Sequence, residues 1–256
     1  MAGEGAFRSK VVVVTGGAGG IGRAVCDGFA AEGASIAVAD VRGTAEAAAE
    51  LCATHGVTAR GYELDVSDRD AVVAVMDAVR DDLGGLDVLV TLAGGSLGTP
   101  KGLEEIEPEH VDLVVDVNVK GTFYCAQAAL ARMPDDGSVV TVSSIGGRQP
   151  SPVTGVPYAA SKAAVLGLTR RLAREVGARG QRVNAVAPGL FLTGRLQEMY
   201  DEMPAAERDE VLGAIPLGRF PELREIVDPI LFLAGPASSY ITGVVLDVNG
   251  GRFMPL

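Results

Sequence analysis

The feature that most limits how this chain can fold is a buried-strand pattern followed directly by a glycine-rich turn and a helical pattern. Residues 11–14 are all valine, which is typical of a short strand covered on both faces. Glycines in the turn at 15–22 let the backbone bend sharply and approach a pyrophosphate, and the amides that open the next helix point at its charge. A merely flexible loop is the alternative, but the strand before the turn and the helix after it favour a dinucleotide site. The expected contacts in this turn are Gly16, Gly19, Gly20, Ile21 and Gly22.

Strand and helix patterns alternate along the rest of the chain. We expect further strands at 35–39, 58–64, 86–90, 138–142, 182–187 and 244–248, and helices at 21–31, 44–54, 68–83, 108–132 and 222–233, with another beginning near Tyr158. This alternation predicts an α/β fold: a doubly wound parallel sheet, or Rossmann fold, with helices on both faces. A length of 256 residues fits one domain, residues 1–256, better than two small ones.

Residues that follow the expected strands are placed to meet the rest of a dinucleotide. Asp40 lies about twenty residues past the glycines, where a carboxylate accepts both ribose hydroxyls of an adenosine and repels a 2′-phosphate. We therefore predict NAD rather than NADP, although Arg42 could pair with such a phosphate. Asp65 and Val66 are placed to border the adenine, with a helix cap as the alternative for Asp65. The further expected contacts, after the fourth strand, are Ala93 and Gly94.

A possible acid–base group lies at Ser144, Tyr158 and Lys162. If residues 158–162 open a helix, the spacing of four places the phenol and the ammonium on one face. A nearby cation favours the phenolate, which would bring the tyrosine pKa down from about 10 towards the working range. Ser144 ends the expected strand at 138–142, where a hydroxyl could polarise a substrate carbonyl. By itself a Tyr four residues before a Lys more often decorates a solvated helix face.

Charge and composition exclude several classes of function. The chain has 33 acidic and 22 basic residues, a net charge of -11, which repels nucleic acid and anionic lipid. The cluster of Arg170, Arg171 and Arg174 is interpreted as one basic helix face. No apolar run is long enough to span a membrane, and residues 1–10 lack a signal-peptide pattern, so we expect a cytoplasmic protein. Three cysteines and two histidines show no disulfide or metal-ligand spacing, and we expect no metal.

Together these residues resemble the short-chain dehydrogenase/reductase family over nearly the whole chain. The matching positions are the turn at 15–22, Asp40, Asp65, Asn118, Ser144, Tyr158, Lys162, Pro188, Gly189, Thr193 and residues 248–251. Two positions depart from the family pattern: Thr91 and Leu92 stand where two asparagines are common. The interval from Ser144 to Tyr158 is also one residue longer than is common.

The resemblance implies a role for each matching residue. Tyr158 would be the general acid/base, Lys162 would hold the nicotinamide ribose and depress the tyrosine pKa, and Ser144 would orient the substrate oxygen. Asn118 would hold a water in the proton relay behind Lys162. The residues implied to border the nicotinamide carboxamide are Pro188, Gly189 and Thr193. The family also implies a homotetramer in which the helices of Asn118 and Tyr158 pack against a partner.

We therefore predict an NAD(H)-dependent oxidoreductase that interconverts a secondary alcohol and a ketone. One alternative is an NADPH-dependent 3-oxoacyl or other ketoreductase. An alternative of another class is a catalytically silent dinucleotide sensor, because fold does not dictate function.

The substrate is predicted from the least regular segments. Residues 190–213 form either a mobile lid or a packed surface helix. An apolar inner face would come from Phe191, Leu192, Leu196, Met199 and Met203. Arg148 could hold a carboxylate or phosphate, but a lone loop arginine is more often solvated. These patterns predict a mainly apolar cyclic or medium-chain ketone or alcohol.

Overall fold

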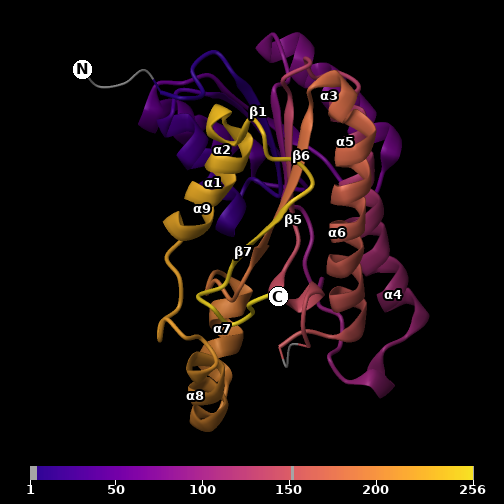
Figure 1. The fold of residues 1–256 in the computed structure, drawn as a ribbon, viewed down its shortest axis with the longest axis vertical. Coiled ribbons are helices and arrows are strands. Elements are labelled where there is room, and N and C mark those ends of the chain that lie inside the picture. Colours follow the sequence, from indigo (N-terminus) through magenta and orange to yellow (C-terminus); the bar gives the residue numbers. More distant parts are fainter. Residues whose placement is uncertain (1–4, 151–152, 256) are drawn as a thin grey trace.

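Seven parallel strands form one sheet in the order β3-β2-β1-β4-β5-β6-β7 (Figure 1). The computed structural model describes residues 5–150 and 153–255, and gives only the backbone of Arg195, Leu196 and Met199. The strands are β1 Val11–Thr15, β2 Ser35–Asp40, β3 Ala59–Glu63, β4 Val88–Thr91, β5 Ser138–Val142, β6 Arg182–Pro188 and β7 Val245–Val248. The strand order reverses direction between β1 and β4, which is where an open parallel sheet forms its ligand crevice. The predicted doubly wound parallel sheet is confirmed.

Helices cover both faces of this sheet (Figure 1). The helices are α1 Gly20–Ala31, α2 Thr44–His55, α3 Arg69–Leu83, α4 Pro108–Val115, α5 Thr122–Leu130, α6 Val156–Val176, α7 Arg195–Glu202, α8 Ala205–Gly213 and α9 Arg224–Ala234. One core lies under α1, α2 and α9 and includes Val14, Phe29 and Ile230. The other lies under α3, α5 and α6 and includes Val13, Met76 and Val183. The valines of β1 alternate between the two cores because successive strand residues point to opposite faces.

The helix expected at 108–132 is not continuous. A π-helical turn, Asp116–Gly121, separates α4 from α5 and contains Asn118. Such turns hold one more residue than an α-helical turn and occur often at functional sites. The expectation of one uninterrupted helix is therefore wrong at the residue that the family resemblance singles out.

Residues 190–213 contain two short helices, α7 and α8. The segment packs through Leu190 and Val211 against Val153, with Leu192 and Met203 partly buried beside them. Phe191 belongs instead to the core under α1, α2 and α9. The side chains of Leu196 and Met199, which were expected on the same apolar face, lie outside the described residues.

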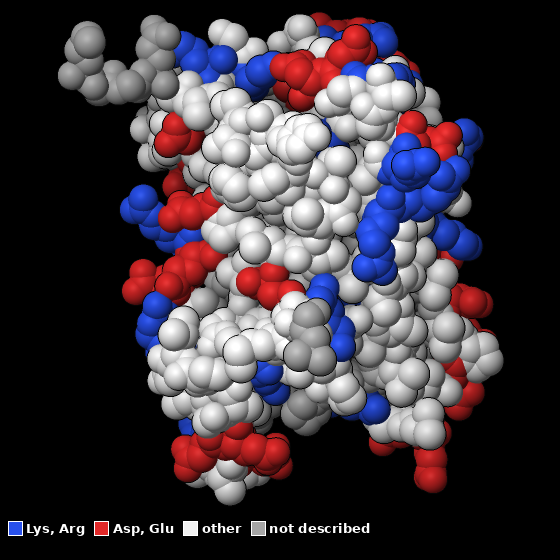
Figure 2. Space-filling model, in the orientation of Figure 1, with Lys and Arg blue, Asp and Glu red and all other residues white. Residues whose placement is uncertain are grey.

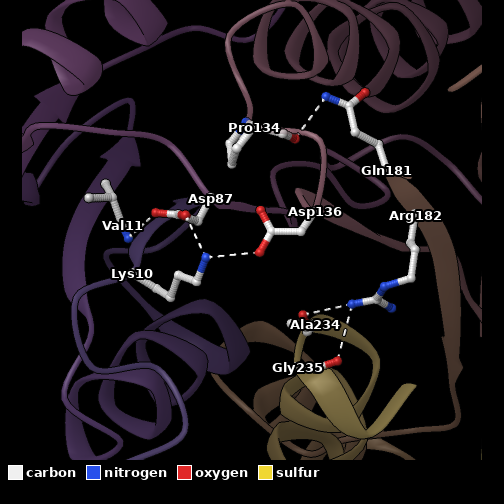
Figure 3. A network of polar contacts seen from close by, with 9 residues as sticks. All are labelled: Lys10, Val11, Asp87, Pro134, Asp136, Gln181, Arg182, Ala234 and Gly235. Atoms are coloured by element: carbon white, nitrogen blue, oxygen red, sulfur yellow. Dashed lines mark hydrogen bonds and ion pairs between the residues drawn. The ribbon is translucent and has the colours of Figure 1, made fainter. Parts of the chain in front are cut away.

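A polar network ties the strands together at the edge of the sheet where they begin (Figure 3). The Lys10 ammonium bonds Asp87 Oδ1 at 3.0 Å and Asp136 Oδ2 at 3.2 Å, and the Val11 amide donates to Asp87 Oδ2 at 2.8 Å. Arg182, which is 8 % exposed, donates to the carbonyls of Ala234, at 2.9 Å, and Gly235, at 3.1 Å, after α9. The network fixes the amino edge of the sheet, and the opposite, carboxyl edge is left for ligands.

Charged side chains are unevenly spread over the surface (Figure 2). Arg170, Arg171 and Arg174 are all exposed on α6, as the predicted basic helix face requires. Acidic side chains gather over α8 at the lower end of the view. No helix among the described residues is long and apolar enough to cross a membrane.

Candidate active site

The glycine-rich turn folds so tightly that side chains would not fit at two of its positions. Gly16 has a φ of +69°, and a Cβ added to it would lie 2.8 Å from the Ala93 amide nitrogen. A Cβ on Gly22 would lie 1.9 Å from the Gly16 carbonyl oxygen. The first glycine therefore brings β1 against the end of β4, and the last lets α1 pack on the turn. The result is an open cradle at the amino end of α1.

A cleft of about 950 Å³ begins at this cradle and follows the carboxyl ends of the strands. The expected cofactor contacts that line it are Gly16, Gly19, Ile21, Gly22, Asp40, Asp65, Val66, Ala93, Gly94 and Thr193. Gly20 has a φ of +53° at the start of α1, and a Cβ there would be 3.6 Å from Thr193 Oγ1. Pro188 is buried at the end of β6 and is not among the residues that line the cleft. The space suits an extended dinucleotide with its pyrophosphate at the cradle.

Asp40 lines this cleft at the end of β2. Its carboxylate accepts the Ala18 amide at 3.1 Å and the Val41 amide at 2.8 Å, so the turn and β2 hold it in place. A carboxylate has about four acceptor positions, which leaves two for ribose hydroxyls. Arg42 lines the same cleft.

The floor next to Asp40 is formed by Asp65 and Val66. Asp65 Oδ1 accepts the amide and the hydroxyl of Ser67, at 2.9 and 2.7 Å. The cap of α3 is Asp68, whose carboxylate accepts two amides of the first turn, so the helix-cap alternative for Asp65 is wrong. Val66 is 5 % exposed and packs so closely on Gly121 that a Cβ there would lie 2.5 Å from it.

A second pocket, of about 430 Å³, adjoins the cleft and is lined by Ser144 and Tyr158. Gly94, Leu97 and Thr193 line both spaces, so they are continuous. Gly189, one of the residues implied to border a nicotinamide, lines the second pocket. A substrate here and a nicotinamide in the cleft would meet in front of Tyr158.

Close packing positions the two hydroxyls. The turn Ile145–Gly147 after β5 lies so near α6 that a Cβ on Gly147 would be 2.6 Å from the backbone of Lys162. Ser144 Oγ accepts the Gly146 amide at 3.0 Å, which fixes its rotamer. Its hydroxyl then hydrogen bonds with Tyr158.

Burial and this hydrogen bond act oppositely on the acidity of Tyr158. Burial raises the pKa of Tyr158 above its ordinary value of 10.0, and the hydrogen bond with Ser144 lowers it by a smaller amount. The expectation of a lowered pKa is therefore wrong for this structure. The phenol is protonated at neutral pH, as a proton donor must be.

Lys162 lies beneath Tyr158 as a buried cation. It is 5 % exposed, donates to the Val142 carbonyl at 2.9 Å, and its Nζ lies 5.9 Å from the centre of the Tyr158 ring. Burial lowers the pKa of Lys162 to about 8. A charged Lys162 favours the phenolate over the phenol, because a nearby positive charge stabilises the negatively charged form.

Asn118 connects the loop after β4 with α6. Its side chain accepts the Gly95 amide at 3.0 Å, donates to the Gly95 carbonyl at 3.0 Å, and donates to Ser161 Oγ at 2.9 Å. The side chain is fully buried. The π-helical turn is what directs it inward. Asn118 therefore fixes one wall of the cleft, and its water-holding role stays a prediction.

The end of β4 lacks the side-chain bonds that two asparagines would supply. Thr15 Oγ1 accepts the amides of Leu92 and Ala93 at 3.2 and 3.3 Å, so β1 braces this turn. Thr91 Oγ1 is buried without a hydrogen-bond partner among the described residues. The hydrogen bonds from Thr15 therefore replace those of the second asparagine, at Leu92. Nothing among the described residues replaces those of the first, at Thr91.

Arg148 is neither solvated nor directed at the substrate pocket. Its Nε lies 3.3 Å from Asp247 Oδ1, and the two side chains are 15 and 14 % exposed. The contact is an ion pair without hydrogen-bond geometry, since neither atom has a hydrogen-bond partner. The guanidinium also lies 4.8 Å from the ring centre of Phe253. The expectation of a solvated arginine is wrong, because the loop packs on the C-terminal segment.

Two cations in the substrate pocket were not expected from the sequence. Lys101 and Arg252 both line it, with Leu97, Thr154 and Gly155. Both come from irregular segments, one after β4 and one after β7, where no periodic pattern marks a residue as inward-facing. Among the described residues, no group of histidine, cysteine and carboxylate side chains could hold a metal ion.

Comparison with known proteins agrees with this geometry. A family model described as enoyl-(acyl carrier protein) reductase matches residues 16–252. The chain is 37 % identical over 250 residues to the 3-oxoacyl-[acyl-carrier-protein] reductase FabG of Staphylococcus aureus, covering 96 % of this chain and 99 % of that one. It is 39 % identical over 250 residues to the FabG of Thermotoga maritima, covering 96 and 98 %.

The chain belongs to the short-chain dehydrogenase/reductase family. A solved structure of this fold, NAD⁺-bound xylitol dehydrogenase, superimposes with a TM-score of 0.90 at 30 % identity, covering 96 % of this chain and 99 % of that one. Family membership makes the protein an oxidoreductase. It does not select a substrate, since the matches are named after an enoyl group, a 3-oxoacyl group and a sugar alcohol.

Proposed function

We propose that this short-chain dehydrogenase/reductase is an NAD(H)-dependent enzyme that interconverts a ketone and a secondary alcohol. The observation that carries the proposal is that Ser144 and Tyr158 line a pocket that shares Gly94, Leu97 and Thr193 with the cleft at the glycine-rich turn. A ketone in that pocket can face the cofactor and a proton donor at once. When bound, the nicotinamide supplies or accepts the hydride.

The protein supplies the proton and the orientation. Ser144 is proposed to donate a hydrogen bond to the carbonyl oxygen, and the Tyr158 hydroxyl to donate the proton as charge develops there. The charge on Lys162 favours the phenolate that this transfer leaves behind. Oxidation of an alcohol uses the same groups in reverse, with Tyr158 as the base.

NAD is the proposed cofactor because Asp40 lies where the adenosine ribose would bind. A carboxylate accepts ribose hydroxyls and repels a 2′-phosphate across a few ångströms. Asp40 is also held by two backbone amides and cannot easily turn away. Arg42 is the basic residue among the described residues that line the cleft, and it could favour NADP.

A reductase of 3-oxoacyl thioesters is the second candidate. Its support is the similarity to two 3-oxoacyl-[acyl-carrier-protein] reductases over almost the whole chain. The two candidates share the chemistry and differ in the substrate's length. A 3-oxoacyl thioester that is turned over with a kcat/KM well above that of every free ketone would favour this candidate.

We also propose a cytoplasmic homotetramer whose α4, α5 and α6 faces meet a partner subunit. Val111 and Leu113 of α4 are 40 and 45 % exposed, so this helix carries two apolar side chains that a partner subunit could cover. Light scattering of the purified protein measures the assembly directly. A monomer at micromolar concentration would exclude it.

The proposed function is tested by a screen of ketones and secondary alcohols with NAD(H) and NADP(H), read at the nicotinamide absorbance. We expect turnover with NAD(H) for at least one ketone and alcohol pair. Cofactor binding without turnover of any compound would instead support a catalytically silent dinucleotide sensor.

A further inference from the structure

Two cations stand in the substrate pocket of a protein that is acidic overall. Lys101 and Arg252 line the pocket that holds Ser144 and Tyr158, and no Asp or Glu is among the described residues that line it. The whole chain has 33 acidic and 22 basic residues. The pocket therefore has a local charge opposite to that of the molecule.

Both cations lack a carboxylate partner among the described residues. Within the described part of the chain, no Asp or Glu side chain pairs with Lys101 or Arg252, whereas Arg148 nearby is paired with Asp247. Asp247 is thus already occupied. An unpaired guanidinium or ammonium that borders a pocket is a ready partner for an oxyanion.

Arg252 is held in place by the C-terminal segment, which lies beside the end of β7 (Figure 1). Asn249, 8 % exposed, accepts the Gly251 amide at 3.0 Å and the Phe253 amide at 3.3 Å. The Arg252 amide donates to the Asn249 carbonyl at 3.2 Å, and Gln149 donates to the Arg252 carbonyl at 3.4 Å. These bonds hold the backbone of Arg252 on both sides, so its half-buried side chain begins from a fixed point at the pocket.

Lys101 reaches the same pocket from the loop after β4. The loop that carries it packs on Gly155, just before the helix of Tyr158. A Cβ on Gly155 would lie 2.4 Å from the Pro100 carbonyl oxygen and 3.4 Å from Lys101 Cα. The Lys101 side chain is exposed and can bend towards an anion at the mouth of the pocket.

The rest of the pocket lining is apolar or uncharged. Ile145, Val153 and Leu190 contribute hydrocarbon surface, and they suit the carbon skeleton of a ketone. Hydrocarbon alone, however, offers no anionic partner for the two cations. Covering the half-buried Arg252 guanidinium with an apolar substrate, and no oxyanion, would cost binding energy.

We propose that the substrate is a ketone, or the matching alcohol, that carries an oxyanion group bound by Arg252 with help from Lys101. This proposal rests on the proposed function and adds which class of ketone the enzyme would prefer. Arg252 provides the planar fork that pairs with a carboxylate or a phosphate, and Lys101 adds a second positive charge. It replaces the mainly apolar substrate predicted from the sequence, and it moves the anion site from Arg148 to Arg252.

The test uses two matched pairs of ketones with NADH. One pair is 3-oxohexanoate and its methyl ester, and the other is 4-oxopentyl phosphate and 5-hydroxypentan-2-one. We expect at least one anion to have a kcat/KM about tenfold or more above its neutral partner, as a charged hydrogen bond provides. The pair with the larger ratio tells whether the oxyanion is a carboxylate or a phosphate.

Variants then locate the preference. Arg252→Gln should raise KM for the favoured anion about 10- to 100-fold, with kcat and the neutral partner nearly unchanged. Arg252→Lys should keep part of the preference and Lys101→Gln should reduce it by less. Arg170→Gln removes an exposed cation outside the pocket and should leave the preference for the anion unchanged. Added salt should raise KM for the anion and not for its neutral partner.

Three results would overturn the proposal. The neutral partners could be used as well as the anions by the unaltered protein. Arg252→Gln could slow both members of a pair equally, which would mean that Arg252 only shapes the pocket. If neither pair nor any other ketone is turned over although NADH binds, the proposed function itself fails and the anion specificity fails with it.

Discussion

At the scale of single residues, cofactor choice rests on Asp40. We expect kcat/KM with NAD to exceed that with NADP by at least about tenfold, which corresponds to about 1.4 kcal/mol. Asp40→Ser should narrow this ratio, because it removes the charge that repels a 2′-phosphate. Steady-state kinetics with both cofactors measure the ratio. Arg42→Ser is the matched control and should widen it.

The NAD assignment would fail if the unaltered protein used NADP equally well or better. A loss of activity with both cofactors in Asp40→Ser would indicate a structural role for the Asp40 carboxylate. It would mean that the bonds from Ala18 and Val41 to the carboxylate shape the turn itself.

Lys162 should set an upper pH limit for ketone reduction. Burial lowers its pKa to about 8, so the ammonium is charged below that pH and loses its proton above it. A charged Lys162 stabilises the phenolate left on Tyr158. The kcat for reduction should therefore fall as pH rises through about 8, and a stopped-flow or steady-state pH profile shows this.

Lys162→Arg supplies the comparison, since a guanidinium keeps its charge throughout this range. Its kcat should be lower, because the geometry differs, but the fall near pH 8 should disappear. A fall at the same pH in both proteins would assign the titration to another group.

Single site residues were predictable where backbone and chemistry both restrict the residue type. Gly16 and Gly22 have no room for a Cβ, and Tyr158 with Lys162 has a helical spacing, so each leaves a pattern in the sequence. Lys101 and Arg252 leave none, because only the packing of two distant loops brings them together. The pKa of Tyr158 was predicted in the wrong direction for a related reason: burial raises this pKa more than the hydrogen bond with Ser144 lowers it, and burial depends on the whole fold.

At the scale of elements, the π-helical turn is the clearest case of a structure that the sequence pattern hides. Residues 108–132 show a helical distribution of apolar side chains, and a single extra residue in one turn does not disturb it. The turn is needed because Asn118 must reach Gly95 and Ser161 at once.

Asn118→Ala should therefore cost both stability and activity. It leaves the part-buried amide and carbonyl of Gly95, and the Ser161 hydroxyl, without these partners, and each group left unpaired costs about 1–3 kcal/mol where water cannot replace the bond. We expect a free energy of unfolding lower by about 2 kcal/mol or more, measured by urea denaturation. Ser161→Ala is the milder control, because it keeps both bonds between Asn118 and Gly95 and removes the Ser161 hydroxyl's bonds with Asn118 and the Tyr158 carbonyl.

If Asn118→Ala lost activity without any loss of stability, the side chain would have a catalytic role instead. That result would favour the water-holding role that the family resemblance implies.

At the scale of the whole molecule, the fold was predictable because its rules are general. Strands that alternate with helices must lie parallel, and the order from β3 to β7 is the usual one for a dinucleotide-binding sheet. The structure of the segment at 190–213 was harder to predict from the sequence. Its helices α7 and α8 are short, and their few buried side chains, such as Val211, give too weak a period to separate a packed helix from a lid.

The central claim is that Tyr158 moves the proton while the nicotinamide moves the hydride. The most direct measurement compares the unaltered protein with Tyr158→Phe on the best ketone found, together with the Kd for NADH. We predict that kcat falls by about 10²–10⁴-fold, the usual contribution of a general acid, while Kd changes by less than tenfold. Lys162→Ala should lose nearly as much, and the double variant little more, because the two residues act as a unit. A Tyr158→Phe variant that kept its turnover, with NADH bound as before, would contradict the account.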